Sequence, residues 1–176
     1  MNELVLNVAR KLNDRLSLVR EGLAQQVGSV VARRAAEQSL QQGATVIEVA
    51  GLCETALTKA ADEITAELVW AINHALYPWE SFVRELEQMA RGFIEQIGHG
   101  ANEQMQKAER LSKCPPHRLG LHLQSVKERA ISSIEVAVQR GRMERTRSLL
   151  LKSLGVLVSA PIAGYLIKFL ISYCMK

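Results

Sequence analysis

The sequence predicts an all-α protein: an elongated antiparallel helical bundle or coiled coil of about four long helices, with a C-terminal single transmembrane helix as a tail anchor. Apolar residues recur at steps of three and four along most of the chain, which is the spacing of one helical face. Proline occurs at only four of the 176 positions, so long helices are rarely interrupted. Residues 153–175 contain a single charged side chain, Lys168. A helix needs about 20 apolar residues to cross the hydrocarbon core of a bilayer.

The first two predicted helices cover residues 3–41 and 44–76. The apolar positions of the first are Val5, Ala9, Leu12, Leu16, Val19, Leu23, Val27 and Val30. Those of the second are Ala50, Cys53, Leu57, Ala60, Ile64, Leu68, Ala71 and Ala75. Gly43 is expected to stop the first helix, because glycine readily adopts the left-handed conformation of a helix C-cap. Small side chains let a neighbouring backbone approach closely, so we expect the second helix to lie at the centre.

The third predicted helix covers residues 79–112, and the fourth begins near Leu119. Their apolar positions are Leu86, Ala90, Phe93, Ile97, Ala101, Met105, Ala108 and Leu111, then Leu123, Val126, Ala130, Ile134 and Ala137. Tyr77-Pro78 and Lys113-Cys-Pro-Pro116 separate the helices, because a residue that precedes proline avoids helical geometry. Gly98-His-Gly100 is a point where the third helix is expected to divide in two.

The short connections at 42–43, 77–78 and 113–116 favour antiparallel neighbours. The alternative is a more open arrangement in which a second copy of the chain completes the apolar faces. Both alternatives place the apolar positions of the four helices in contact with other helices.

The C-terminal run has two interpretations. Apolar side chains surround the whole helix from residue 153 to 175, whereas a surface helix of a bundle keeps a polar face. The alternative is a buried C-terminal helix that is kinked at Pro161. The favoured division is a cytosolic helical bundle over 1–148 and a transmembrane anchor over 149–176. Lys168 opposes the anchor, but its long side chain can extend to the nearer interface.

Basic residues precede the run and give it a direction. The predicted membrane collar consists of Arg140, Arg142, Arg145, Arg147 and Lys152, with Glu144 as the single acid among them. Arginines beside a membrane span stay on the cytoplasmic side, and they attract anionic lipid headgroups. We therefore expect a single-pass membrane protein with a cytoplasmic N-terminal body and membrane lipid as a partner. Because three of the four excess positive charges, Lys152, Lys168 and Lys176, lie beyond residue 148 and the body is nearly neutral, a nucleic-acid partner is not expected.

Two further groups are candidate interaction sites. Small residues within the run, Gly155, Ser159 and Ala163 together with Ala160 and Gly164, form a face on which membrane helices pack closely. This face predicts a homo-oligomer. Four aromatic residues, Trp70, Tyr77, Trp79 and Phe82, gather around the Pro78 turn. They are a candidate partner surface or interfacial aromatic belt, but the favoured interpretation is that they form the packed end of a bundle.

The sequence contains no pattern that indicates catalysis or a cofactor. Cys114, His117, His122 and His99 do not have the spacing of a zinc site. The three cysteines, Cys53, Cys114 and Cys174, are odd in number and scattered, which favours a reducing compartment for the body. We expect no enzymatic activity, no cofactor and no metal.

Two functional hypotheses follow from these features. The first is a tail-anchored scaffold, adaptor or regulator that acts by protein–protein interaction at a membrane, through a partner that the sequence leaves unidentified. The second is a membrane-perturbing effector, such as a toxin, lysis or defence protein, whose C-terminal helices assemble in the bilayer.

Overall fold

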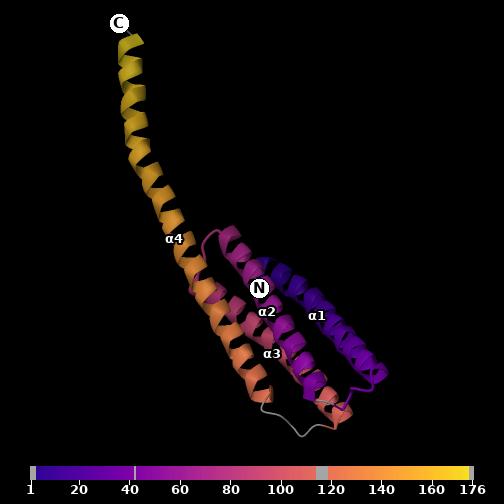
Figure 1. Ribbon diagram of the computed structural model, residues 1–176. Helices are drawn as coiled ribbons and strands as arrows, with labels where there is room; N and C mark the ends of the chain where they lie inside the picture. Colours follow the sequence, from indigo (N-terminus) through magenta and orange to yellow (C-terminus); the bar gives the residue numbers. More distant parts are fainter. Residues whose placement is uncertain (1–2, 42, 114–118, 175–176) are drawn as a thin grey trace.

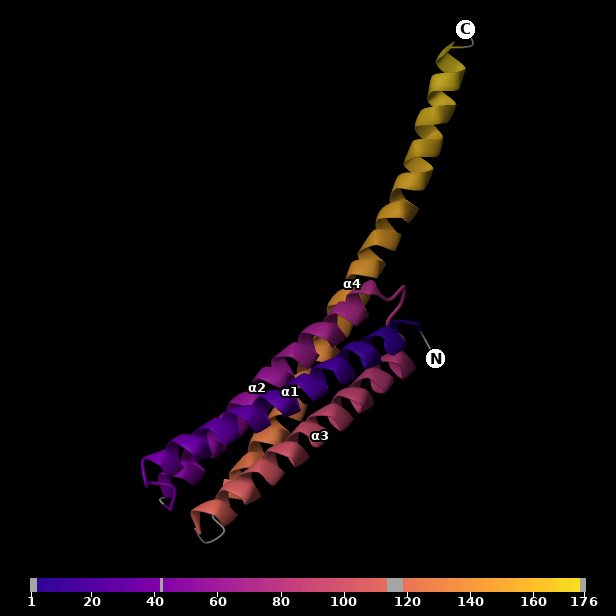
Figure 2. The same cartoon turned by 90° about the vertical axis from the view of Figure 1, so that its right-hand side faces the viewer.

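The computed structural model describes the backbone of residues 3–41, 43–113 and 119–174, and the side chains of 3–41, 43–113 and 122–153. Four helices account for most of it: α1 (Glu3–Ala36), α2 (Gly43–His74), α3 (Glu80–Ser112) and α4 (Leu119–Cys174). The predicted all-α four-helix bundle is confirmed. Figures 1 and 2 show α1, α2, α3 and the first half of α4 side by side in an elongated bundle.

Polar contacts between helices fix their directions. Arg15 on α1 pairs with Glu63 on α2, and Arg34 pairs with Glu48, so residue numbers fall along one helix as they rise along the other. The same reversal relates α3 to α4, where Gln139 donates a hydrogen bond to Glu87. Consecutive helices are therefore antiparallel, as the short connections predict.

Helices α2 and α3 form the centre of the bundle. Each contacts all three of the other helices, whereas α1 and α4 make no direct contact with each other in the described part of the chain. In cross-section, α1 and α4 thus lie on opposite sides of the α2–α3 pair. The predicted central position of α2 is confirmed, and its small residues permit the close packing: Ala50, Ala60, Ala61, Ala71 and Ala75 are all buried.

The apolar faces of the helices meet within one chain. All eight predicted positions of α2 are buried, and so are seven of the eight predicted for α3. On α3, Leu111 is instead exposed and Ser112 is buried, because the step that follows Ala108 is four residues rather than three. The described residues therefore form a closed core without a second copy.

The end of α1 differs from the prediction. The helix ends at Ala36, and Gln38 adopts the left-handed conformation with φ 56°. The backbone N–H of Ser39 donates to the Arg34 carbonyl and that of Gln38 donates to the Ala35 carbonyl, which is the Schellman arrangement. The prediction that Gly43 stops α1 is wrong, because Gly43 is the first residue of α2.

The predicted division of α3 at Gly98 and Gly100 is wrong, because the helix is continuous from Glu80 to Ser112. The two glycines instead let other helices come close. A Cβ at Gly98 would lie 3.0 Å from Cδ of Lys127 on α4, and one at Gly100 would lie 3.6 Å from Nε of Arg20 on α1.

The second half of α4 extends beyond the other helices. The backbone remains helical to Cys174, and Figures 1 and 2 show this part projecting from one end of the bundle. The alternative of a C-terminal helix buried inside the bundle therefore does not describe this structure. No helix in the described part of the chain has the length and apolar character needed to cross a bilayer. The side chains from residue 154 onward, which make up nearly all of the apolar run, lie outside the described residues.

Candidate functional site

The candidate site is the end of the bundle from which α4 emerges. The turn between α2 and α3 lies at this end, beside the point where α4 leaves the other helices (Figures 1 and 2). Two groups of predicted residues meet here: the aromatic residues around Pro78 and the basic residues of the collar. The structure separates each group into residues that support the fold and residues that remain accessible.

Three large side chains on the α2–α3 turn are exposed. Leu76 is 94% exposed, Trp79 66% and Tyr77 44%, while Pro78 between them is buried. The ring centroids of Tyr77 and Trp79 lie 4.6 Å apart with a tilt of 54° between the rings. The interpretation of the turn as a packed end of the bundle is therefore wrong for these residues.

Two of the four predicted aromatic residues belong to the body of the bundle. Phe82 is only 7% exposed and packs in the core. Trp70 is half-buried, with the His74 ring stacked on it at 4.4 Å and Nζ of Lys11 lying 4.6 Å from its ring centroid. Of the four predicted residues, only Tyr77 and Trp79 remain in the candidate partner surface. Leu76 joins them, and the sequence analysis missed it because it considered only aromatic residues.

The backbone of the turn explains this division. Trp79 is the N-cap of α3 and has extended backbone angles, φ −56° and ψ 149°. In extended backbone, alternate side chains point to the same side. Tyr77 and Trp79 therefore project outward together, while Pro78 between them packs inward.

The five collar residues have three different environments. Arg145 is half-buried, and its Nη2 donates a 3.0 Å hydrogen bond to the backbone carbonyl of Ala75. Arg140 pairs with Glu144 one turn away, where both side chains are exposed. Arg142, Arg147 and Lys152 have no ion-pair partner among the described residues. Arg147 and Lys152 are exposed and provide the accessible positive charge, while Arg142 is half-buried.

Arg145 therefore connects α4 to the candidate site. The last carbonyls of a helix have no partner within the helix, and Arg145 satisfies one just beyond the end of α2. Its Nε is buried without a hydrogen-bond partner. This contact holds the α2–α3 turn beside α4 just before α4 leaves the bundle, so the prediction of Arg145 as part of an open collar is corrected.

The sequence analysis missed an exposed apolar strip on α4. Val136, Met143 and Leu150 are 66%, 65% and 58% exposed and lie seven residues apart, so they share one face of the helix. The sequence contained this pattern, because Val136, Met143 and Leu150 are apolar residues at seven-residue spacing that do not belong to the buried series Leu123, Val126, Ala130 and Ile134. Arg140 and Arg147 flank the strip at the same seven-residue spacing.

The predicted packing face of the anchor cannot be described at the level of side chains. Gly155, Ser159, Ala163, Ala160 and Gly164 all lie outside the residues whose side chains the structure describes, although their backbone is helical. Their role in self-association stays a prediction.

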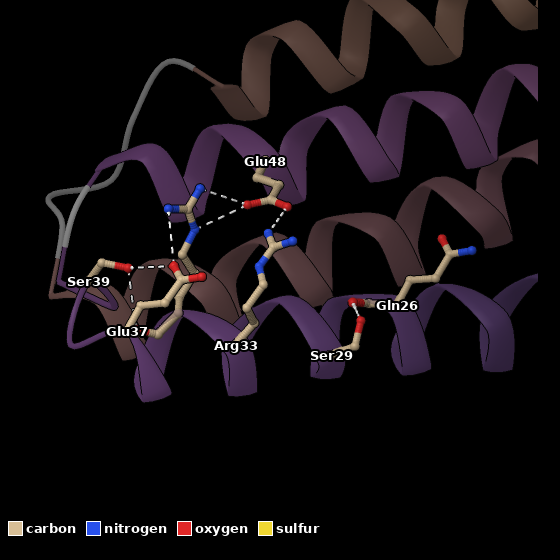
Figure 3. A network of polar contacts seen from close by, with 7 residues as sticks. Gln26, Ser29, Arg33, Glu37, Ser39 and Glu48 are labelled. Atoms are coloured by element: carbon tan, nitrogen blue, oxygen red, sulfur yellow. Dashed lines mark hydrogen bonds and ion pairs between the residues drawn. The ribbon is translucent and has the colours of Figure 1, made fainter.

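Other polar groups of the bundle support the fold. Figure 3 shows the largest of these networks, in which Arg33 and Arg34 from α1 both bind Glu48 of α2 near the α1–α2 connection. The hydrogen bond from Arg33, followed by that from Arg34, lowers the pKa of the Glu48 carboxyl, and the Arg33–Glu48 bond also raises the pKa of Arg33. Arg34 also pairs with Glu37, so the two arginines and the two carboxylates of this network neutralise one another.

The remaining candidates for chemistry are also structural. Burial raises the pKa of the Cys53 thiol to about 11, so it is protonated at neutral pH and a poor nucleophile. Its Sγ lies 3.4 Å from the Ala101 carbonyl across the α2–α3 contact. Within the described ranges, no group of His, Cys, Asp and Glu residues is arranged to hold a metal ion.

An open groove of about 370 Å³ lies between α1 and α3, where Arg20, Leu23, Ile97 and Glu103 are among its lining residues. The groove is shallow and its lining mixes polar and apolar residues.

Searches against protein-family models, curated proteins and solved structures found no match for this chain.

Proposed function

We propose that this chain is a tail-anchored helical protein that holds its bundle at a membrane surface and acts there by protein–protein interaction. One observation carries the proposal: α4 continues as a helix beyond the bundle to Cys174, and the projecting part coincides with the run 153–175, which has one charged residue. An apolar helix that projects into water leaves its side chains unfavourably hydrated.

The energetics of insertion support the anchor. Between residues 153 and 175 the run contains the large apolar residues Leu154, Val156, Leu157, Val158, Ile162, Leu166, Ile167, Phe169, Leu170 and Ile171. On the insertion scale, each contributes about −0.3 to −0.6 kcal/mol at the helix centre, so the ten together contribute roughly −3 to −6 kcal/mol. Lys168 costs about 2.5–3.5 kcal/mol at the centre and less near the end of a span. With Lys168 at the centre the sum lies between about −3.5 and +0.5 kcal/mol, so these terms favour insertion when Lys168 lies near the end of the span.

The unpaired cations support the proposed orientation. Arg142, Arg147 and Lys152 precede the run, whereas Lys176 is the only charge after it in this sequence. The positive-inside rule then places the bundle in the cytoplasm. Each cation near an anionic membrane surface contributes about 1 kcal/mol to binding.

The part of the exposed strip that precedes the anchor, Val136 and Met143, is the proposed contact for a protein partner. Arg140, Arg142 and Arg147 lie beside it, so it suits a partner helix with an apolar face bordered by acidic side chains. Anchoring raises the effective concentration of this strip toward partners in the same membrane. The Ala-rich face of α2 is occupied within the bundle and is not available for this role.

Self-association is proposed through the small residues of the anchor. Gly155, Ser159 and Ala163 recur at four-residue intervals, so two helices could approach closely along this face in a bilayer. Gly155→Leu and Ser159→Leu are expected to reduce dimer crosslinking in vesicles, while Leu157→Ile, on the opposite side of the helix from Gly155, is the control and should leave it unchanged.

Carbonate extraction of membranes tests the anchor. We expect the full chain to stay in the membrane pellet, and the variant Ile162→Asp and the truncation 1–148 to be released. Leu18→Asp is the matched control, since Leu18 is exposed on α1. Release of the full chain by carbonate contradicts the proposal. Leakage of dye from vesicles that contain the full chain, but not from vesicles treated with 1–148, would support the membrane-perturbing alternative.

A further inference from the structure

We propose that the α2–α3 turn is a second membrane contact, in which Leu76, Tyr77 and Trp79 enter the boundary between headgroups and acyl chains of the bilayer that holds the anchor. This inference rests on the proposed function, because it requires α4 to be inserted. Its occupant is a lipid surface rather than a protein. The consequence is a bundle fixed in orientation at two points instead of one.

The chemistry of the turn suits this boundary. Trp and Tyr are enriched at membrane interfaces because their rings are apolar while the indole N–H and the phenol O–H remain hydrogen-bonded. Tyr77 and Trp79 project together with their rings in contact, and Leu76 beside them is the most exposed of the large apolar residues in the described part of the chain. In water these three side chains would remain hydrated at a cost.

The position of the turn carries the argument. The hydrogen bond from Arg145 to the Ala75 carbonyl places the residue before Leu76 beside α4. The predicted anchor starts at residue 149, which is four residues or about 6 Å of helix rise beyond Arg145. The headgroup layer on one side of a bilayer is roughly 5–8 Å thick. The turn therefore lies at headgroup depth when residue 149 is at the edge of the hydrocarbon and Lys152 extends its side chain back to the headgroups. With the edge at residue 153, Arg145 would lie about 12 Å from it and the turn would stay in water, and the quenching test distinguishes the two placements.

The charges around the turn are compatible with an anionic lipid surface. Arg142, Arg147 and Lys152 are unpaired within the described residues, while the acids near the turn, Glu80 and Glu144, are paired with Arg84 and Arg140. Other exposed apolar residues, such as Leu18 in the middle of α1 and Ile47 near the start of α2, lie away from this end. The turn thus combines exposure, aromatic chemistry and proximity to the anchor.

The test uses the two tryptophans of the full chain. Trp70→Phe leaves Trp79 as the single fluorophore, and Trp79→Phe leaves the half-buried Trp70 as the matched control. Each variant is reconstituted in vesicles of phosphatidylcholine and phosphatidylglycerol, and insertion is verified by carbonate resistance. Quenching is then compared between lipids brominated near the headgroup, lipids brominated deep in the chain, and iodide in water.

We expect the emission of Trp79 to shift to shorter wavelength on reconstitution and to be quenched most by the shallow brominated lipid, with much weaker quenching of Trp70. If the chain is inserted but Trp79 remains quenched by iodide and not by brominated lipid, the inference is overturned while the anchor stands. Protection of Trp79 from both quenchers also overturns it, because a protein or a second copy then covers the turn. Failure of insertion removes both the anchor and this inference.

Discussion

Gln38 ends helix α1 in a conformation that costs most residues energy. A side chain in the left-handed region costs about 1–2 kcal/mol relative to the right-handed helix, yet Gln38 holds φ 56° at the C′ position of a Schellman motif. The two backbone hydrogen bonds from Gln38 and Ser39 compensate, because they satisfy carbonyls that the helix end would otherwise leave without partners.

Glycine at position 38 should therefore stabilise the protein. We expect Gln38→Gly to raise the free energy of unfolding by about 0.5–1 kcal/mol, because the left-handed penalty exceeds the entropic cost of glycine. Urea denaturation measures the change. Gln25→Gly, in the exposed middle of α1, is the control and should instead lower the stability by about 0.5–1 kcal/mol. Equal losses in the two variants would contradict the assigned conformation of Gln38.

Glu48 makes the stability of the bundle depend on pH. Its pKa is lowered in the folded protein by the hydrogen bonds from Arg33 and Arg34. A lowered carboxyl pKa stabilises the folded state above the unfolded pKa of about 4.3, and this contribution is lost as the pH falls through the folded pKa. Protonation of Glu48 thus weakens the network in Figure 3 that joins α1 to α2.

We expect Glu48→Gln to be less stable than the parent chain at pH 7 and to lose less stability between pH 5 and pH 3. Thermal unfolding at several pH values measures both effects. Glu95→Gln is the control, because Glu95 is an exposed carboxylate without an ion pair among the described residues. A parallel pH profile for parent and Glu48→Gln would show that this network does not contribute to acid sensitivity.

At the scale of elements, α4 is attached to the end of α2 through one arginine. Arg145 donates to the carbonyl of Ala75, whereas Arg142, three residues earlier on the same helix, has no such partner in the described part of the chain. From composition and spacing alone, Arg142 and Arg145 could not be distinguished as members of the predicted collar. Their difference depends on where α2 ends relative to α4.

Loss of Arg145 should weaken this attachment selectively. We expect Arg145→Ala to lower the free energy of unfolding by about 1.5–3 kcal/mol, the range for a hydrogen bond that involves a charged group. Arg142→Ala should remain within about 0.5 kcal/mol of the parent, as is usual for substitutions outside such contacts. Hydrogen exchange of the α2–α3 turn should also increase in Arg145→Ala alone. Similar losses in the two variants would contradict the separate roles assigned to them.

Helix α3 contains glycines with different surroundings. A Cβ at Gly92 would meet nothing within 4 Å, whereas one at Gly98 would meet the side chain of Lys127 at 3.0 Å. We expect Gly92→Ala to raise the stability by about 0.8–1 kcal/mol through helix propensity. Gly98→Ala should gain less, because the Lys127 side chain must move. Urea denaturation of both variants measures the contrast, and a larger gain at Gly98 would contradict the close α3–α4 approach.

At the scale of the whole molecule, the folded body and the projecting part of α4 share one helix but not one core. The last core residue of α4 in the described part of the chain is Val138, and Arg145 makes the last hydrogen bond from α4 to the rest of the bundle there. Leu150 and Leu151 are already exposed. The described structure therefore assigns the stability of the bundle to residues before 149.

A truncated chain should keep that stability. In matched detergent, we expect 1–148 to unfold with the same denaturant midpoint as the full chain, because no buried residue of the described core is removed. The comparison chain 1–133 lacks Ile134, Val138 and Arg145, and should lose several kcal/mol, since removal of one large core side chain alone costs about 2–5 kcal/mol. A much less stable 1–148 would indicate that the projecting segment packs against the body.

Local patterns predicted most of the fold. The steps of three and four located the buried face of each helix, and Pro78 and Pro115-Pro116 marked two of the three connections. The predictions that failed, at Gly43 and at Gly98–Gly100, treated glycine as a signal for the end of a helix. In the structure Gly98 and Gly100 provide room for Lys127 and Arg20, and a glutamine caps α1. These outcomes depend on neighbouring helices that local sequence does not specify.

The candidate site was predicted in part. The favoured interpretation as a packed end holds for Phe82, which is in the core, but Tyr77 and Trp79 are exposed and Leu76 was missed. Four aromatic residues near one proline look alike in sequence. Their exposure is decided by the extended backbone of the turn and by which positions fall on the buried face of α3.

The sequence by itself determined the number of helices, their apolar faces and the uncharged C-terminal run, because each of these is a periodic or compositional property of consecutive residues. Only the tertiary structure decided that α3 shares the centre with α2, that Arg145 binds the residue after α2 while Arg147 stays exposed, and that the α2–α3 turn lies beside the emerging α4. The physical reason is that these features depend on the relative alignment of helix ends. That alignment is set by the packing of all four helices together.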